Sequence, residues 1–81
     1  MTVRVQLFAV ARQLAAAESV EIELSSGATV AELRAALGEQ VPALAPLLRQ
    51  TLFAVNAEYA SDRTVLPKGA EVACIPPVSG G

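Results

Sequence analysis

Residues 19–38, SVEIELSSGATVAELRAALG, pass directly from an alternating pattern into a helical one, and this junction decides the fold. Over residues 19–25, apolar side chains alternate with glutamates, which is the period-two pattern of a strand with one buried face and one wet face. A strand followed at once by an amphipathic helix predicts a sheet with that helix packed across it. The apolar positions of the strand are Val20, Ile22 and Leu24, and the polar positions between them are Glu21 and Glu23.

The helical segment is expected to begin after Thr29. Thr29 and Glu32 have the spacing of a capping box, in which each side chain accepts a hydrogen bond from the other residue's free backbone N–H. We expect the helix to end at Gly38, because glycine is favoured at a helix C-terminus. Apolar side chains spaced i, i+3 and i+7 form one buried stripe, made of Val30, Leu33 and Leu37.

The remaining segments supply further strands. The order along the chain is strand, strand, helix, strand, short strand, strand, which is typical of an α+β domain with a mixed sheet and one main helix across one face. We therefore predict the β-grasp, or ubiquitin-like, fold, in which the first and last strands are central neighbours. Strands are expected at residues 2–8, 51–56, 58–61 and 71–76, with a short helical turn at 11–18 and a turn or 3₁₀ segment at 42–50.

Composition limits what the chain can do. With 81 residues it is expected to hold one domain, which we place at residues 1–76, followed by a flexible tail at residues 77–81. The six basic residues are scattered, which argues against nucleic-acid binding, and no apolar run approaches transmembrane length. The lack of histidine removes the usual general base and metal ligand, and one cysteine permits no internal disulfide. We expect a cytoplasmic protein with no metal site and no membrane partner.

The ending PPVSGG suggests chemistry at the terminal carboxylate. Gly80 and Gly81 lack a Cβ, so they can pass through a channel too narrow for other residues and leave the carboxylate open to attack. A carboxylate is a poor electrophile, so a partner enzyme would have to activate it, for instance as an acyl-adenylate made from ATP. Pro76 and Pro77 would hold the tail extended, and residues 76–81 could reach about 20 Å. The alternative is a loose end with no role.

Strand parity predicts an apolar patch beside the root of this tail. The charged first residue of EVACIP must face water, so Ala73 and Ile75 share its outward face while Cys74 faces the core. Phe8 lies on the outward face of the first strand, and the first and last strands are neighbours in the predicted sheet. Phe8, Ala73 and Ile75 would therefore form one exposed patch of the kind that marks a docking surface. The alternative is that residues 42–50 cover them.

Other candidate side chains have ordinary structural explanations. No positive group lies beside Cys74 in the sequence to lower its pKa, so we expect core packing rather than a reactive thiol. Arg12 either pairs with an acid of a partner or lies on a solvated helix face. Asp62 and Lys68 are expected in turns. The glutamates of the second strand have no third ligand in view, so no metal site is predicted.

Several stretches together resemble the family of molybdopterin synthase small subunits, which are ubiquitin-like sulfur carriers of molybdenum cofactor biosynthesis. The resemblance covers residues 3–81, and its most specific part is the ending EVACIPPVSGG. In the family, an aromatic residue often stands at the position of Cys74 or Ile75, and an acidic residue at the position of Gln13. This sequence departs from the family at these positions. The other matching stretches are LFAVARQL (7–14), TVAELRAAL (29–37) and AVN (54–56).

The resemblance implies a role for the terminal carboxylate. An ATP-dependent, ubiquitin-activating-like adenylyltransferase would adenylate Gly81, and a sulfur donor protein would supply the sulfur of a thiocarboxylate. The tail, with Val78, Ser79 and Gly80, would enter the active site of the large synthase subunit, where sulfur passes to cyclic pyranopterin monophosphate. The small subunit would bind no cofactor, would not be catalytic alone, and would form a heterotetramer with the large subunit. Its expected contacts with that subunit are Phe8, Arg12, Ala73, Ile75, Pro76 and Pro77.

Other functions could use the same ending. A ubiquitin-like modifier would join its terminal glycine to lysines of target proteins. A sulfur carrier of thiamine biosynthesis would form the same thiocarboxylate, although its tail usually lacks the double proline. A plain β-grasp interaction domain would not use its end at all. High-mass conjugates would favour the modifier, and a free form in which sulfur has replaced an oxygen would favour a carrier.

Overall fold

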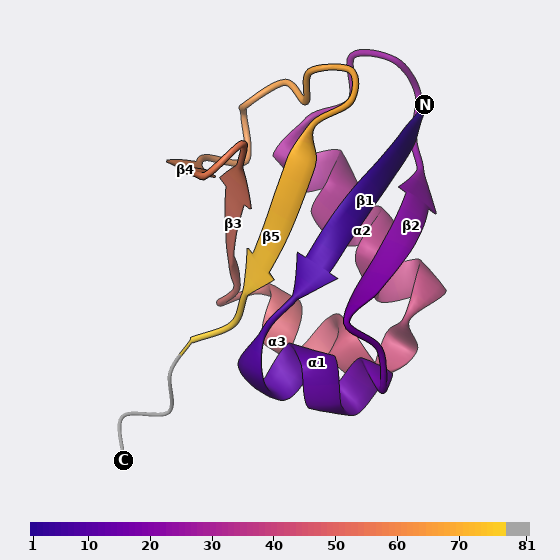
Figure 1. Ribbon diagram of the computed structural model, residues 1–81, viewed down its shortest axis with the longest axis vertical. Helices are drawn as coiled ribbons and strands as arrows, with labels where there is room; N and C mark the ends of the chain where they lie inside the picture. Colours follow the sequence, from indigo (N-terminus) through magenta and orange to yellow (C-terminus); the bar gives the residue numbers. More distant parts are fainter. Residues whose placement is uncertain (78–81) are drawn as a thin grey trace.

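The first and last strands lie side by side in the middle of the sheet, as the β-grasp prediction requires (Figure 1). The computed structural model describes residues 1–77. Its strands are β1 (Thr2–Leu7), β2 (Ser19–Glu23), β3 (Leu52–Val55), β4 (Glu58–Ala60) and β5 (Glu71–Ile75). Within the described residues the strand order is β2-β1-β5-β3-β4, with β1 and β5 parallel and the other neighbours antiparallel. The predicted α+β fold is confirmed. The helices are α1 (Ala9–Ala15), α2 (Val30–Gln40), the 3₁₀ helix η1 (Pro42–Leu44) and α3 (Ala45–Leu48).

The core fills the space between the sheet and α2, which crosses one face of the sheet (Figure 1). Alternate residues of β1 point to this side, and the stripe of α2 predicted from helical spacing meets them. Burial of these aliphatic side chains is the main force that holds the helix on the sheet. The buried residues include Val3, Val5, Leu7, Ile22, Val30, Leu33, Leu37, Phe53, Val72 and Cys74.

The start of α2 is as predicted, but its end is not. The capping box is formed, with the backbone N–H of Glu32 donating to Oγ1 of Thr29 and the backbone N–H of Thr29 donating to Oε1 of Glu32. The expectation that the helix ends at Gly38 was wrong, because α2 continues to Gln40. It stops there because Val41 precedes a proline, which disfavours helical geometry.

Gly38 has a packing reason instead. A Cβ at this position would lie 3.2 Å from Cδ1 of Leu48, so the missing side chain lets α3 approach α2 closely.

None of the helices within residues 1–77 combines the length and the apolar character that crossing a membrane would demand.

Residues 42–44 form a 3₁₀ segment of the kind predicted for residues 42–50, but residues 45–48 form a short α-helix that was not predicted. Leu44 and Leu48 are buried, and η1 and α3 pack against α2. These segments therefore lie on the helical side of the sheet, behind the strands in Figure 1. The opposite face of the sheet is left open, so the alternative in which residues 42–50 cover the apolar patch was wrong.

Candidate functional site

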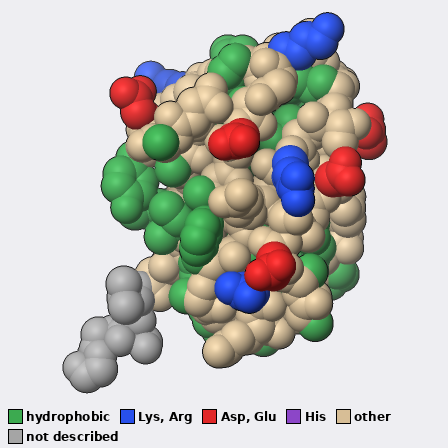
Figure 2. Space-filling model, in the orientation of Figure 1, with side chains coloured by type: hydrophobic (Ala, Val, Ile, Leu, Met, Phe, Trp, Pro, Cys, Tyr) green, Lys and Arg blue, Asp and Glu red, His purple; other side chains and the backbone are tan. Residues whose placement is uncertain are grey.

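The open face of the sheet carries an apolar hollow of ≈ 440 Å³ near the end of β5. It includes all three residues of the patch predicted from strand parity, and the structure brings them onto one surface. Figure 2 shows hydrophobic side chains gathered at this end of the molecule, beside the last described residues. We call this surface the apolar hollow; it is lined by Phe8, Ala54, Ala57, Tyr59, Ala73 and Ile75.

Strand pairing explains why this surface is concave. Ala73 of β5 lies opposite Ala54 of β3, and Ala54 lies opposite Tyr59 of β4, so two small side chains form the floor. Phe8 directly follows β1, and its backbone N–H donates to the carbonyl of Cys74 at 3.3 Å. That hydrogen bond fixes Phe8 beside the end of β5. Small residues in the middle with large rings at two sides produce a hollow that an apolar side chain of a partner could fill.

The charged side chains of this face lie toward the other end of β1 and β5. Arg4 of β1 stands between Glu21 of β2 and Glu71 of β5 in the strand register, and all three side chains are exposed. The face therefore has a charged half and an apolar half. A partner that covers only the apolar half would not have to remove these charges from water, which would be costly.

The two prolines at the root of the tail differ in exposure. Pro76 is buried and Pro77 is exposed, so Pro76 offers little surface to a partner in the free domain. The predicted tail-threading residues and the predicted reactive residue lie outside the described residues. These are Val78, Ser79, Gly80 and Gly81.

Arg12 is occupied within the domain itself. Its Nη2 lies 2.8 Å from Oε1 of Glu18, and the two side chains are 58% and 80% exposed. Arg12 and Phe8 line a second, polar hollow beside the apolar one. An exposed ion pair of this kind is worth little, so an acid of a partner could replace Glu18 at small cost. The structure thus shows a solvated ion pair, and the predicted contact with a partner stays a prediction.

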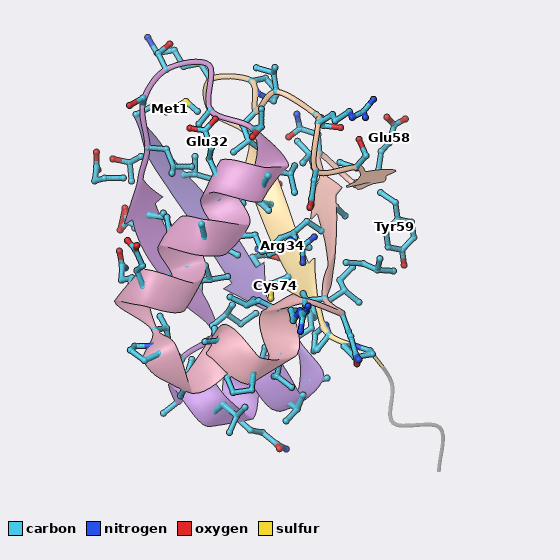
Figure 3. All side chains as sticks on the ribbon, turned by 180° about the vertical axis from the view of Figure 1, so that it is seen from behind. Met1, Glu32, Arg34, Glu58, Tyr59 and Cys74 are labelled. Carbon is cyan, nitrogen blue, oxygen red and sulfur yellow. The ribbon has the colours of Figure 1, made fainter. Side chains whose placement is uncertain are left out.

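Cys74 lies on the opposite side of the sheet from the apolar hollow. Its side chain is fully buried, as parity predicted, and it points toward α2 near Arg34 (Figure 3). Burial raises the pKa of the Cys74 thiol to about 11, and the positive charge of Arg34 lowers it by less. A thiol in this setting is unreactive. Within residues 1–77, side chains that could ligate a metal do not gather in groups of three or more.

Arg34 is an organising residue that sequence reasoning missed. Its guanidinium donates to the backbone carbonyls of Leu48 and Thr51, the latter at 2.8 Å, and to Oδ1 of Asp62 at 2.8 Å. It also lies 4.9 Å from the centre of the Phe53 ring. Asp62 is in a turn as predicted, and its pairing with Arg34 ties that turn to α2. No local spacing in the sequence could reveal contacts between residues so far apart.

Two large exposed side chains extend the apolar surface beyond the predicted patch. Leu52 is 57% exposed and lies opposite Ile75 in the strand register, and Tyr59 is 72% exposed on β4. A signal for Leu52 was present, because Phe53 of the same strand faces the core and parity therefore places Leu52 outside. The placement of Tyr59 and Ala57 on this face depended on the exact hairpin turn, which could not be determined from the sequence.

Known proteins resemble this chain over its whole length. Residues 5–81 match the ThiS family. The molybdopterin synthase sulfur carrier subunit of Chlamydomonas reinhardtii is 39% identical over 83 residues, covering 100% of each chain. SAMP1 of Haloferax volcanii, a small archaeal modifier protein, is 28% identical with a TM-score of 0.87 over 100% of each chain. The Helicobacter pylori complex of subunits 1 and 2 of molybdopterin-converting factor contains a chain that is 28% identical, with a TM-score of 0.69 over 100% of each chain. This chain therefore belongs to the ThiS family.

Proposed function

We propose that this chain is the sulfur carrier subunit of molybdopterin synthase, and that Gly81 carries the sulfur as a C-terminal thiocarboxylate. The observation that carries the proposal is the likeness to the sulfur carrier subunit of C. reinhardtii, which extends over the whole of both chains. The apolar hollow and the PPVSGG ending support it, because a carrier needs a surface for its partner and a reactive end close by.

The apolar hollow is the surface on which we expect the large synthase subunit to bind. In H. pylori, subunit 1 of molybdopterin-converting factor was solved as a complex with subunit 2. The hollow includes Ile75, and the chain from Ile75 to Gly81 can span at most about 20 Å. A large subunit docked on the hollow must therefore hold its active site within about that distance of Ile75.

The chemistry begins with activation of the terminal carboxylate. A ubiquitin-activating-like adenylyltransferase would join the Gly81 carboxylate to AMP from ATP, with release of pyrophosphate. A sulfur donor protein would then supply sulfur at the sulfide level, which attacks the acyl carbon, breaks its bond to AMP and leaves a thiocarboxylate. In the heterotetramer with the large subunit, this sulfur would pass to cyclic pyranopterin monophosphate. All of these steps would take place in the cytoplasm, and the carrier itself would bind no cofactor.

Variants of the chain end test this proposal. Deletion of Gly81, or addition of one alanine after it, should abolish conversion of cyclic pyranopterin monophosphate in a reconstituted synthase. A shift of one residue moves the reactive carbon by roughly 3.5 Å, whereas reaction requires approach to within about 3–3.5 Å. Melting temperature should stay near that of the parent, because neither change alters a residue of the described core, which runs from Val3 to Cys74. Conversion at the parent rate by either variant would refute the role of Gly81.

A ubiquitin-like modifier is the second candidate, and the likeness to the H. volcanii modifier protein favours it. Both functions begin with the same activation of a terminal glycine. They differ in the product, because a modifier forms amide bonds with lysines of other proteins. Immunoblots of extract from the protein's own cells would show a ladder of high-mass conjugates for a modifier and a single free species for a carrier of sulfur.

A further inference from the structure

The turn between β3 and β4 holds an alanine in a backbone conformation that favours glycine. Val55 pairs with Glu58, so Asn56 and Ala57 form a two-residue hairpin loop, and their φ angles are +50° and +71°. Positive φ at both positions is the pattern of a type I′ turn, whose usual sequence is Asn-Gly. Asn56 fits this pattern, but Ala57 carries a Cβ that is strained in the left-handed region.

The surrounding structure holds this turn firmly in place. The backbone N–H of Asn56 donates to the carbonyl of Glu71 at 2.8 Å, and Oδ1 of Asn56 accepts from the backbone N–H of Glu71 at 3.0 Å. These two hydrogen bonds tie the turn to the first residue of β5. Strain of this kind persists where neighbouring contacts over-determine the backbone, and such residues cluster at functional sites.

Ala57 also lines the apolar hollow, together with Tyr59 of the same hairpin and Phe8 from across the sheet. Ala57 is exposed, so its methyl group does not pack in the core. A glycine at this position would relieve the strain and would open the hollow on that side. The side chain of Ala57 therefore destabilises the free domain while completing a surface that only a partner can cover.

We propose that the methyl group of Ala57 is a contact for the large synthase subunit, which inserts an apolar side chain between Ala57, Tyr59 and Phe8. This inference rests on the proposed function. The large subunit is the expected occupant because the hollow continues to Ile75 at the root of the tail, which that subunit must receive. Glu71, in the charged half of this face, is hydrogen-bonded to the turn, so the apolar contact at Ala57 lies at the border between the charged half and the apolar half.

A second alanine with positive φ provides a matched control. Ala16 ends α1 with a φ of +54°, and it lines a different hollow that shares no residue with the apolar hollow. Ala57→Gly and Ala16→Gly should each raise the melting temperature by a few degrees, because glycine adopts this conformation without strain. Ala57→Asn and Ala16→Asn should melt at or slightly above the parent temperature, because asparagine tolerates positive φ better than alanine does.

Binding to the large subunit, measured by calorimetric titration with the full chain, separates the two positions. Ala57→Gly should weaken binding about fourfold, the effect of losing one buried methyl group, and Ala57→Asn should weaken it more by placing an amide in the apolar hollow. Both Ala16 variants should bind as the parent does. Parent-like affinity of Ala57→Asn, or equal losses at both positions, would overturn the inference while leaving the proposed function intact. Failure of the parent itself to bind the large subunit would overturn both.

Discussion

Replacing Ile75 by aspartate tests whether the apolar hollow is the docking surface. Ile75 is half-buried on the open face, next to Leu52 in the strand register. Full burial of an isoleucine side chain is worth about 1.5–3 kcal/mol, so the part still to be buried by a partner accounts for about 1 kcal/mol. An unpaired carboxylate forced into an apolar contact adds at least about 2 kcal/mol. Together these effects predict binding to the large subunit that is on the order of a hundredfold weaker.

The free domain should tolerate the same substitution. The carboxylate of Ile75→Asp would face water before binding, so we expect the free energy of unfolding to change by no more than about 1 kcal/mol. Glu71→Ala, on the same face of β5 but in its charged half, is the matched control and should bind within about twofold of the parent. Calorimetric titration and thermal melting of all three proteins provide the measurements. Parent-like affinity of Ile75→Asp with a normal melt would refute the assignment of the docking surface.

Three further substitutions or reactions probe the scaffold. Thr29→Ala removes the capping box and should lower the free energy of unfolding, measured in urea, by about 1 kcal/mol. A loss no larger than that of an exposed surface variant such as Arg63→Ala would contradict this prediction. Arg34→Ala breaks charged hydrogen bonds to two carbonyls and to Asp62, and should cost about 2–3 kcal/mol of a margin of about 3–5 kcal/mol, with Arg34→Lys recovering part of it. Equal stability of the alanine and lysine variants would contradict the stabilising role of these hydrogen bonds. The Cys74 thiol, with its pKa raised from 9.0 to about 11, should resist alkylation in the folded protein at pH 8 and react after unfolding in urea. Because the folded pKa is the higher one, the stabilisation from the neutral thiol is complete below pH 9 and is lost between pH 9 and about 11; a stability that is flat across this window would contradict the burial of Cys74.

Strand parity and helical spacing predicted most of the fold. Alternation in the first strand placed Val3, Val5 and Leu7 in the core, and the spacing of the helix placed Leu33 and Leu37 against them. These patterns are reliable because each buried face must be continuous for the chain to remove apolar surface from water. The same logic placed the predicted patch on the open face, where the structure brings its residues together.

The errors and omissions came from contacts between segments far apart in the chain. Gly38 was taken for a helix end because local propensity favours that position, whereas the approach of Leu48 decides it. Arg34 gave no local signal, since its partners belong to three other segments. The positive φ of Ala57 could not be predicted, because the sequence indicated where β3 ends but not which turn follows it. Such contacts and turn conformations can be predicted only once the sheet register is known.

The most direct measurement is the intact mass of the protein purified from its own cells, followed by fragmentation of its C-terminal peptide. The account predicts a species in which one oxygen of the chain has been replaced by sulfur, with the change confined to the carboxylate of Gly81. It also predicts that this species disappears when the partner adenylyltransferase is deleted and when cyclic pyranopterin monophosphate and the large subunit are supplied. Sulfur located on Cys74, or a protein whose Gly81 carboxylate never carries sulfur in active cells, would contradict it.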